Sequence, residues 1–293
     1  NLNILNKKSI TLPLGEVKIT RKIENLLIIF RSFTNENKLL SQNKKRLFES
    51  EKKEYTFRSL VSLCQNINNI KNKFKNFNVS LEIIDDNSQK NVVNQMQDIC
   101  IKHNISFKIN NLDITKYEKR MNFRDNSRML AHNSHIVQSK ELALKSEFDL
   151  LYFVEDDYVH EEDALIEMIY SYQKLASQFN DEVVLCPTDY PYLYTQAKNT
   201  KVFLGEKYHW RKIDETLCTF LTSKHIVEKN WDNFLSMCTY EHYPFESPLH
   251  EIYKKELCIS PIPSIAIHCT NINSIYGLSP NKNWKKIWEE NKI

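Results

Sequence analysis

The feature that most constrains this chain is an alternation of short apolar runs with amphipathic stretches, repeated four times before residue 180. Each apolar run is too short for a helix, and each amphipathic stretch repeats its apolar residues every three or four positions. The predicted strands are 26–33, 79–85, 105–109 and 150–154, and the predicted helices carry the stripes at 60–77, 92–100, 129–144 and 164–179. Such alternation predicts an α/β fold, with a mainly parallel sheet covered by helices on both faces.

The boundaries of these elements carry further signals. Ser88 is predicted to cap the second helix, and the third helix is expected to begin at Asn126 or Ser127. The fourth helix is expected to follow directly after residue 157, with acidic residues in its first turn. Beyond residue 181 the order loosens into apolar runs at 183–186, 216–222 and 259–267, separated by aromatic and Pro-containing loops.

Composition excludes several classes of protein. Only three glycines occur, Gly15, Gly205 and Gly277, so neither a P-loop nor a Gly-rich dinucleotide-binding turn can be written. The formal net charge of +3 is too small to indicate nucleic acid binding. No apolar stretch approaches the roughly 20 residues of a membrane span. Seven cysteines without a CxxC pair predict reduced, buried thiols and a cytoplasmic protein.

Consecutive carboxylates end two of the predicted strands. Glu155, Asp156 and Asp157 follow the fourth strand, and Asp85 and Asp86 end the second. Carboxyl ends of parallel strands meet at one edge of a sheet, where ligands bind. Like charges at such spacing need a cation or hydrogen-bond donors nearby. In extended backbone Glu155 and Asp157 point together and Asp156 points away, toward ribose or backbone donors. The alternative interpretation is that these acids only cap the next helix.

The segment Glu155-Asp156-Asp157 resembles the D-x-D motif of GT-A glycosyltransferases, in the Glu-Asp-Asp form found in some N-acetylglucosaminyltransferases. The segment Asp85-Asp86-Asn87-Ser88 resembles the D-D-x-S turn of family 2 enzymes, in which the acid reads the nucleotide base. The resemblance covers most of residues 26 to 268. It implies a GT-A fold and a divalent cation, Mn²⁺ or Mg²⁺, that binds the diphosphate of the donor.

The same resemblance assigns roles to individual residues. Asp157 would be the main metal ligand, with Glu155 and Asp156 at the ribose and the water shell of the metal. His268, at the end of an apolar run, would complete the metal site or touch the diphosphate, or else be a structural histidine. The nucleotide-sugar site would further include Arg31, Thr34, Asp86 and Arg128. For Arg31 a surface salt bridge is an equal alternative.

The general base is sought in the second half of the chain. The segment 245–255 resembles the E-D-x-x-L helix of family 2, which places Glu246 as the base of an inverting reaction. The sequence departs from that pattern because Ser247 stands where the family has Asp. Glu241 and Asp232 remain alternative bases, and capping of the helix is the structural alternative for Glu246. Acceptor-binding residues are expected among Asp189, Tyr190 and Trp210, with core packing as the alternative for the aromatic rings.

The resemblance as a whole implies one GT-A catalytic domain over residues 1–293. Residues 26–160 would bind the nucleotide sugar, 181–270 the acceptor, and 271–293 would form a tail. The implied activity is that of a hexosyl- or N-acetylhexosaminyltransferase, which transfers a sugar from a UDP-sugar or similar donor to a glycan or lipid-linked acceptor in glycan biosynthesis. Two alternatives stay open, a nucleotidyltransferase that makes a nucleotide sugar and a non-catalytic carbohydrate-binding protein.

Membrane contact is a further open question. Lysines between residues 38 and 53, and the tail segment 283–288 with its two tryptophans, could touch the anionic inner face of a membrane that carries a lipid-linked acceptor. The alternative is that both are solvated faces. The sequence therefore predicts a cytoplasmic enzyme and leaves peripheral membrane association open.

Overall fold

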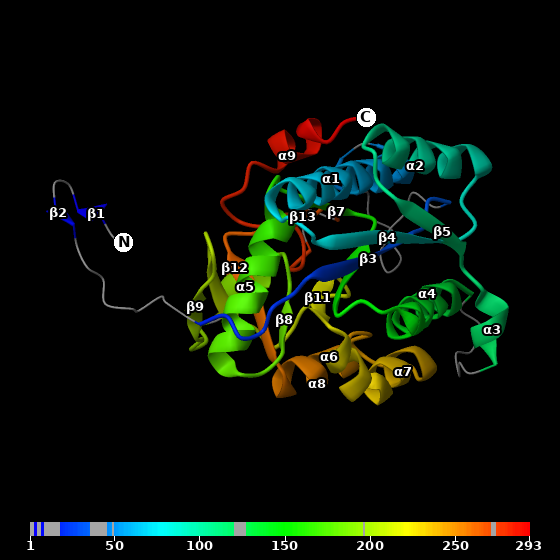
Figure 1. Cartoon of the computed structure of the whole chain (residues 1–293). Helices are drawn as coiled ribbons and strands as arrows, with labels where there is room; N and C mark the ends of the chain where they lie inside the picture. The colour runs from blue at the N-terminus through cyan, green and yellow to red at the C-terminus, as the bar shows by residue number, and fades with distance from the viewer. Residues whose placement is uncertain are drawn as a thin grey trace.

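The structure, a computed structural model, describes residues 3–4, 7–8, 18–35, 46–48, 50–119, 127–195, 197–270 and 274–293. Its centre is a nine-stranded sheet in the order β5-β4-β3-β6-β11-β8-β12-β10-β9, with helices on both faces (Figure 1). The strands of this sheet are β3 (Asn25–Ser32), β4 (Asn78–Asp85), β5 (Phe107–Asn111), β6 (Leu150–Glu155), β8 (Val183–Leu185), β9 (Val202–Leu204), β10 (His209–Lys212), β11 (Phe220–Ser223) and β12 (Leu257–Ile262).

Two smaller pairs of strands accompany the sheet. Strand β1 (Asn3–Ile4) pairs with β2 (Lys7–Lys8), and β7 (Tyr158–His160) pairs with β13 (Ala266–His268). The helices are α1 (Lys52–Lys73), α2 (Lys90–Lys102), α3 (Ile114–Glu118), α4 (Ser127–Lys145), α5 (Ala164–Phe179), α6 (Lys224–Lys229), α7 (Trp231–Thr239), α8 (Ser247–Lys255) and α9 (Trp284–Glu290), with one 3₁₀ turn, η1 (Pro191–Tyr194).

The predicted α/β fold is confirmed. Strands β5, β4, β3 and β6 are all parallel, and each is joined to the next by a helix on the face of the sheet. Successive residues of β3 enter different cores, since Leu26 and Ile28 pack with α1, α2 and α5, whereas Leu27 and Ile29 pack with α4, α7 and α8. Burial on both faces explains why β3 reads as a continuous apolar run.

The second half of the chain is more regular than its sequence indicates, because its strands extend the same sheet. β11 runs antiparallel to β6 and β8, β12 runs parallel to β8, and β10 and β9 complete the edge in antiparallel pairing. The predicted strand 259–267 is two strands, since β12 ends at Ile262 and β13 begins at Ala266. Pro263 lies at the break and has no N–H to donate to a ladder.

Two local predictions are wrong. Ser88 does not cap α2, because the cap position is Gln89 and the Ser88 hydroxyl donates to Asp85. The helix expected directly after Asp157 begins at Ala164 instead, and strand β7 precedes it. That strand pairs with β13, a segment more than one hundred residues later in the chain, so local periodicity contains no signal for it.

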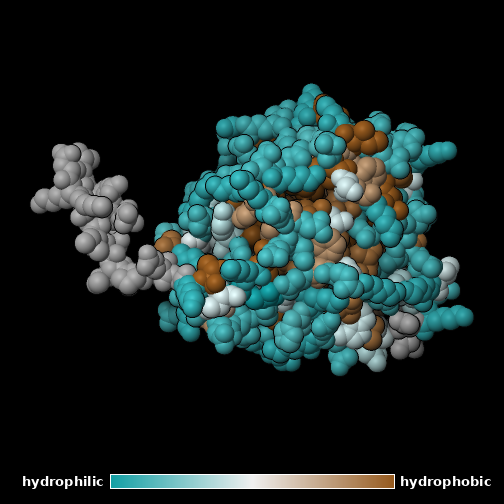
Figure 2. Space-filling view, in the orientation of Figure 1, coloured by the Kyte–Doolittle hydropathy of each residue, from teal (hydrophilic) through white to brown (hydrophobic). Residues whose placement is uncertain are grey.

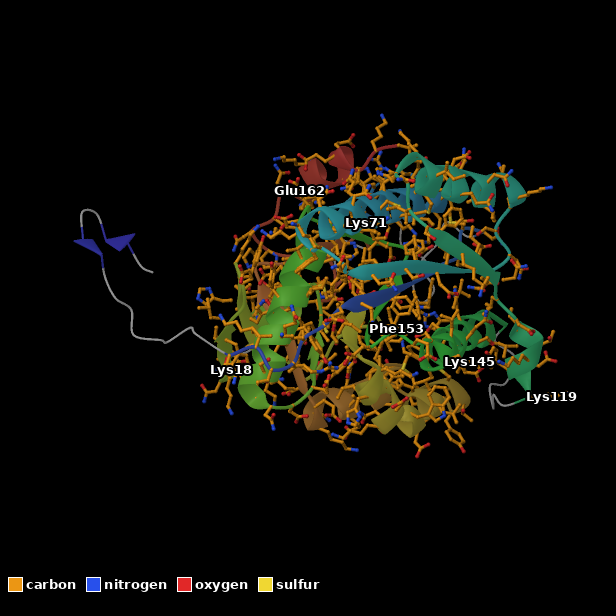
Figure 3. All side chains as sticks on the ribbon, in the orientation of Figure 1. Lys18, Lys71, Lys119, Lys145, Phe153 and Glu162 are labelled. Carbon is orange, nitrogen blue, oxygen red and sulfur yellow. The ribbon has the colours of Figure 1, made fainter. Side chains whose placement is uncertain are left out.

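The side chains of the core and the surface are otherwise as expected. All seven cysteines are free and buried, as predicted. Phe153 lies between the sheet and α4 (Figure 3), with the Lys140 Nζ 3.0 Å from the centre of its ring. The face shown in Figure 2 is mostly hydrophilic, with apolar residues exposed between the polar ones. Among the described residues, no helix has both the length and the apolar character that crossing a bilayer requires.

Candidate functional site

The candidate site lies where β3, β4 and β6 end side by side. Within the ladders Ser32 pairs with Asp85 and Arg31 pairs with Glu155, so the acidic ends of β4 and β6 flank the end of β3. The prediction that both acidic segments open onto one edge of the sheet is therefore confirmed. Each carboxylate there has different partners, and these partners decide what each can bind.

Asp85 organises the turn after β4. Its Oδ1 accepts from the hydroxyls of Ser32 and Ser88, each at 2.7 Å, and its Oδ2 accepts from the Ser88 N–H at 2.9 Å. Asn87 follows in the left-handed region at φ 52°, which asparagine tolerates. Burial and the negative charge of the neighbouring Asp85 raise the pKa of Asp86. Thr34 donates to Ser88 at 2.8 Å, so the ends of β3 and β4 form one connected rim.

A hollow of about 250 Å³ adjoins this rim, between the segment after β3 and the start of α2. Its lining residues are Thr34, Asn35, Glu51, Lys53, Gln89 and Val92. The lining is mainly polar and lies at the carboxyl ends of parallel strands, where a nucleoside would be expected in an α/β sheet.

Glu155 is held by neighbours on both sides. Its Oε1 lies 3.0 Å from Arg31 NH2, and its Oε2 accepts from the Thr219 hydroxyl at 3.3 Å. The Arg31 side chain is 5% exposed, so its partner is this carboxylate and not a surface acid. The alternative of a surface salt bridge for Arg31 is therefore wrong, since the pair is inside the site.

The extended backbone predicted for 155–157 ends at Glu155, because residues 156 and 157 form a turn, so the predicted alternation of the three side chains is wrong. Asp156 meets donors of the protein. Its Oδ2 accepts from the Phe33 N–H at 2.9 Å and the Thr56 hydroxyl at 2.8 Å, and its Oδ1 pairs with Lys52. It therefore fixes the first turn of α1 against the ends of β3 and β6. The helix that follows in sequence, α5, has Asp163 at its cap position, so the three acids do not cap it.

Asp157 faces His268 because β7 and β13 pair antiparallel, with Tyr158 opposite His268. The Cys269 N–H donates to the Asp157 carbonyl at 2.8 Å, and the His268 Nε2 lies 3.6 Å from Asp157 Oδ1. The His268 Nδ1 donates to the carbonyl of Tyr276 at 2.6 Å, and its ring stacks on Tyr158 at 4.5 Å. Metal-binding histidines commonly donate one ring N–H to a carbonyl in this way, which leaves the other nitrogen for the metal; here that nitrogen is Nε2, which faces the Asp157 carboxylate.

The charges of this pair are coupled. Burial alone would raise the pKa of Asp157, but the nearby His268, Lys52 and Arg46 outweigh burial and hold its pKa well below the ordinary value. Burial opposes protonation of His268, and Asp157 and Glu155 outweigh it, so the pKa of His268 is raised. Asp157 is therefore ionised in a region poor in water, where it attracts cations strongly.

The donor set fits a divalent cation that keeps open coordination positions. Two ligand atoms 3.6 Å apart can both lie about 2.1 Å from one ion, and a carboxylate with an imidazole suits Mn²⁺. Within the described part of the chain, no group of three His, Cys, Asp or Glu side chains forms a closed metal site. The described residues thus offer two ligands here, and the remaining positions would be available to a diphosphate and water.

Glu246 lies close to Glu155, at the cap position of α8, yet its side chain makes no capping hydrogen bond. The structural alternative for Glu246, helix capping, is therefore not what the structure shows. Burial and the negative charge of Glu155 raise the pKa of Glu246. A carboxylate with a raised pKa is better suited to take a proton from a hydroxyl.

Two predicted site residues lie elsewhere. Asp232 is exposed in the first turn of α7, next to Asn230, which bonds Glu256 just before β12 begins, at the opposite edge of the sheet. Trp210 is completely buried in the core, where its Nε1 donates to Glu167 of α5 at 3.0 Å. The structure therefore brings neither residue to the site. Arg128 lies in the first turn of α4, and its side chain is outside the described part of the structure.

Asp189 and Tyr190 lie just after β8 and are both buried. Asp189 pairs with Arg211 and accepts from the Tyr194 hydroxyl at 2.5 Å, while burial raises its pKa. Tyr190 shares a 2.5 Å hydrogen bond with the hydroxyl of Tyr158, the residue on which His268 stacks. The carboxylate of Asp189 is thus paired within the protein. Tyr190 bonds Tyr158, on which His268 stacks, so it positions the His268 side of the site.

Two cations of the site, Arg46 and Lys52, were not predicted from the sequence. Arg46 NH1 lies 3.2 Å from Asp157 Oδ2, and Lys52 pairs with Asp156 although its side chain is only 4% exposed. Both residues belong to the Lys-rich segment that was considered for membrane contact. In a segment with so many lysines, a solvated face was the simpler interpretation. Only their pairing with acids more than one hundred positions away distinguishes Arg46 and Lys52 from the other basic residues.

Comparisons with known proteins give no family. No protein-family model matches the chain, and no curated protein shows significant sequence similarity to it. Solved structures do resemble it: residues 1–349 of TarS from S. aureus are 10% identical, and the match covers 80% of this chain and 57% of that chain with a TM-score of 0.45. The mannosyltransferase PcManGT from Pyrobaculum calidifontis, in complex with GDP-Man and Mn²⁺, is 9% identical over 89% of this chain and 61% of its own, with a TM-score of 0.44.

A nucleotidyltransferase is similar to the same degree. The inositol-1-phosphate CTP transferase from T. maritima is 11% identical over 94% of this chain and 98% of its own, with a TM-score of 0.42. The chain spans less than two thirds of the length of TarS and PcManGT as compared. Likeness at these levels does not decide the activity, which has to be argued from the site.

Proposed function

We propose that this chain is a metal-dependent glycosyltransferase of the GT-A type, which transfers a sugar from a nucleotide-diphosphate sugar, with UDP as the first nucleotide to test, onto a glycan or lipid-linked acceptor. The observation that carries the proposal is the pair of Asp157 and His268 at the edge of the sheet, 3.6 Å apart and oriented by the β7 and β13 ladder. Acidic strand ends on both sides of β3 support a nucleotide beside that pair.

Asp157 and His268 would hold the cation, Mn²⁺ or Mg²⁺, which when bound would bridge the diphosphate and stabilise the charge of the departing nucleotide. The rim formed by Thr34, Asp85 and Asp86 would receive the nucleoside. Its hydrogen bonds are already formed, so the turn after β4 needs little rearrangement to bind. Arg31 and Glu155, paired with each other, would border the sugar-phosphate end of the donor.

Glu246 is the proposed general base of an inverting reaction. It would accept the proton of the acceptor hydroxyl as that oxygen attacks the anomeric carbon and the bond to the diphosphate breaks. Its raised pKa and its nearness to Glu155 support this role. Asp232 is not part of the proposal, because it lies at the opposite edge of the sheet.

The wider assignments are proposals as well. We assign residues 26–160 to donor binding and 181–270 to the acceptor side of one catalytic domain spanning 1–293. Seven free, buried thiols favour a reducing compartment such as the cytoplasm. Peripheral membrane contact through the tail finds less support, because Trp288 is 3% exposed and stacks on Phe48 inside the protein.

The test is calorimetric titration with UDP, GDP and CMP, each with and without Mn²⁺, on the wild type and on Asp157→Ala. We expect one nucleotide to bind in a metal-dependent manner and to lose that binding in Asp157→Ala. Asp232→Ala is the matched control, since it removes an exposed carboxylate remote from the site and should bind as the wild type does. Equal binding by Asp157→Ala and the wild type would falsify the assignment of the metal site. Hydrolysis of nucleotide sugars without acceptor is a companion assay.

A further inference from the structure

Arg46 occupies the carboxylate that the proposed function gives to a metal ion. Its NH1 lies 3.2 Å from Asp157 Oδ2, while His268 faces Oδ1, so both oxygens of Asp157 are engaged. The Arg46 side chain is 9% exposed and its guanidinium lies 5.3 Å from the centre of the Tyr55 ring. Arg46 is therefore a built-in counter-ion of Asp157 and not a surface residue that happens to lie near it.

The backbone beside Arg46 is anchored by several contacts, whereas its guanidinium uses few of its hydrogen-bond donors. The Leu47 N–H donates to the Thr270 carbonyl at 3.1 Å, the Phe48 N–H donates to the Tyr55 hydroxyl at 2.7 Å, and the Phe48 ring stacks on Trp288. In contrast, the buried Nε of Arg46 has no hydrogen-bond partner among the described residues. A guanidinium has five N–H donors, so most of its capacity to bind an oxyanion is unused here.

A divalent cation at Asp157 Oδ1 and the Arg46 guanidinium at Asp157 Oδ2 would repel each other. Both would be positive, within a few ångström of each other, in a region where screening by water is weak. Binding of the cation would therefore weaken the pair of Arg46 with Asp157 and favour movement of Arg46 to another anion. The four rotatable bonds of its side chain allow that movement while the anchored backbone stays in place.

We propose that Arg46 is an exchange residue, which neutralises Asp157 when no metal is bound and contacts the diphosphate of the donor once metal has taken Asp157. A diphosphate is the anion that the metal would bring to this point, and its oxygens match the planar fork of a guanidinium. The inference rests on the proposed function. It assigns to Arg46 two opposite effects, competition with the free metal ion and cooperation with the metal–nucleotide complex.

The test separates these two effects with Arg46→Met, which keeps the length of the side chain and removes its charge. Binding of Mn²⁺ alone is followed through the spectrum of free Mn²⁺ in electron paramagnetic resonance. Binding of a nucleoside diphosphate at saturating Mn²⁺ is followed by calorimetry. Relative to the wild type, we expect Mn²⁺ alone to bind at least tenfold more tightly to Arg46→Met and the nucleotide to bind at least tenfold more weakly.

Two further variants keep the test interpretable. Lys73→Met, which removes an exposed positive charge at the far end of α1, should change neither affinity. Arg46→Lys keeps the charge and loses the fork, so it should weaken nucleotide binding without tightening Mn²⁺ binding. If Arg46→Met melts at a much lower temperature than the wild type, the nucleotide arm of the test is read from Arg46→Lys instead.

The outcomes distinguish this inference from the proposed function. If Arg46→Met and the wild type bind Mn²⁺ equally, while nucleotide binding still depends on metal and on Asp157, the exchange is refuted and the proposed function stands. If the variant loses affinity for Mn²⁺ alone, Arg46 does not compete with metal and the inference is likewise overturned. If the wild type binds no Mn²⁺ with or without nucleotide, both proposals are refuted.

Discussion

Replacement of Asp156 by Leu should destabilise the protein more than any change at its acidic neighbours, because Asp156 joins three elements. Its carboxylate accepts from Phe33 after β3 and from Lys52 and Thr56 in the first turn of α1. Asp156→Leu would leave Lys52, whose side chain is 4% exposed, as a buried charge without this partner. Burial already lowers the pKa of Lys52 beside Asp156, which shows how poor in water the position is.

The magnitude follows from the cost of breaking a buried pair. Removing one partner of such a pair costs about 3 to 5 kcal/mol. Since whole domains are stable by about 5 to 15 kcal/mol, a large part of the stability should be lost. Lys52→Met should cost less, because Asp156 would keep the Phe33 N–H and the Thr56 hydroxyl as donors.

The assay is urea unfolding at pH 7, monitored by circular dichroism, on the wild type, the two single variants and the double variant. In the double variant the unpaired charge is gone, so its loss should be smaller than the sum of the single losses. A loss below about 1 kcal/mol for Asp156→Leu would show that the carboxylate is not the joint between α1 and the strand ends, since that is the range of exposed pairs.

Two other predictions concern the interior and the chemistry. Lys140 is buried 3.0 Å from the centre of the Phe153 ring, and burial lowers its pKa well below the ordinary value, so the unfolded chain binds more protons and stability should rise with pH up to about pH 10. Lys140→Met should be more stable at pH 7 and show a smaller rise, as measured by urea midpoints from pH 6 to 9; an unchanged slope would contradict this. Glu246→Gln should lower transfer by about 10² to 10⁴-fold while nucleotide affinity stays the same, and wild-type transfer should increase as pH rises through the raised pKa of Glu246. Retained transfer in Glu246→Gln would mean that another group takes the proton.

The parts of the fold that were predictable are those whose signal is local. The four strand and helix pairs of the first half were predicted because the apolar residues of β3 and β6 form unbroken buried runs and the helices carry regular apolar stripes. The acidic edge was predictable for the same reason, since parallel strands joined by helices must end on one side. The second half was harder, because β8, β9 and β10 have only three or four residues each.

What could not be predicted depends on partners distant in the chain. Trp210 resembled an acceptor-binding ring, but Glu167 accepts its N–H and α5 covers it, and neither neighbour is near it in sequence. In the sequence, Arg46 and Lys52 cannot be distinguished from the lysines around them. Arg46 and Lys52 belong to the site because they pair with Asp157 and Asp156, which follow the end of β6.

The three-residue strand β7 shows why the site itself depends on such distant pairing. Asp157 is the last residue before β7, and the Cys269 N–H binds its carbonyl, so the β7 and β13 ladder fixes the carboxylate relative to His268. Had α5 begun directly after Asp157, as the sequence indicated, Asp157 would be the cap residue of that helix and its carboxylate would accept from backbone N–H groups. The strand instead keeps those donors away from Asp157 and leaves it paired with a histidine and an arginine. Its readiness to bind a cation therefore arises from a short element that only the tertiary structure defines.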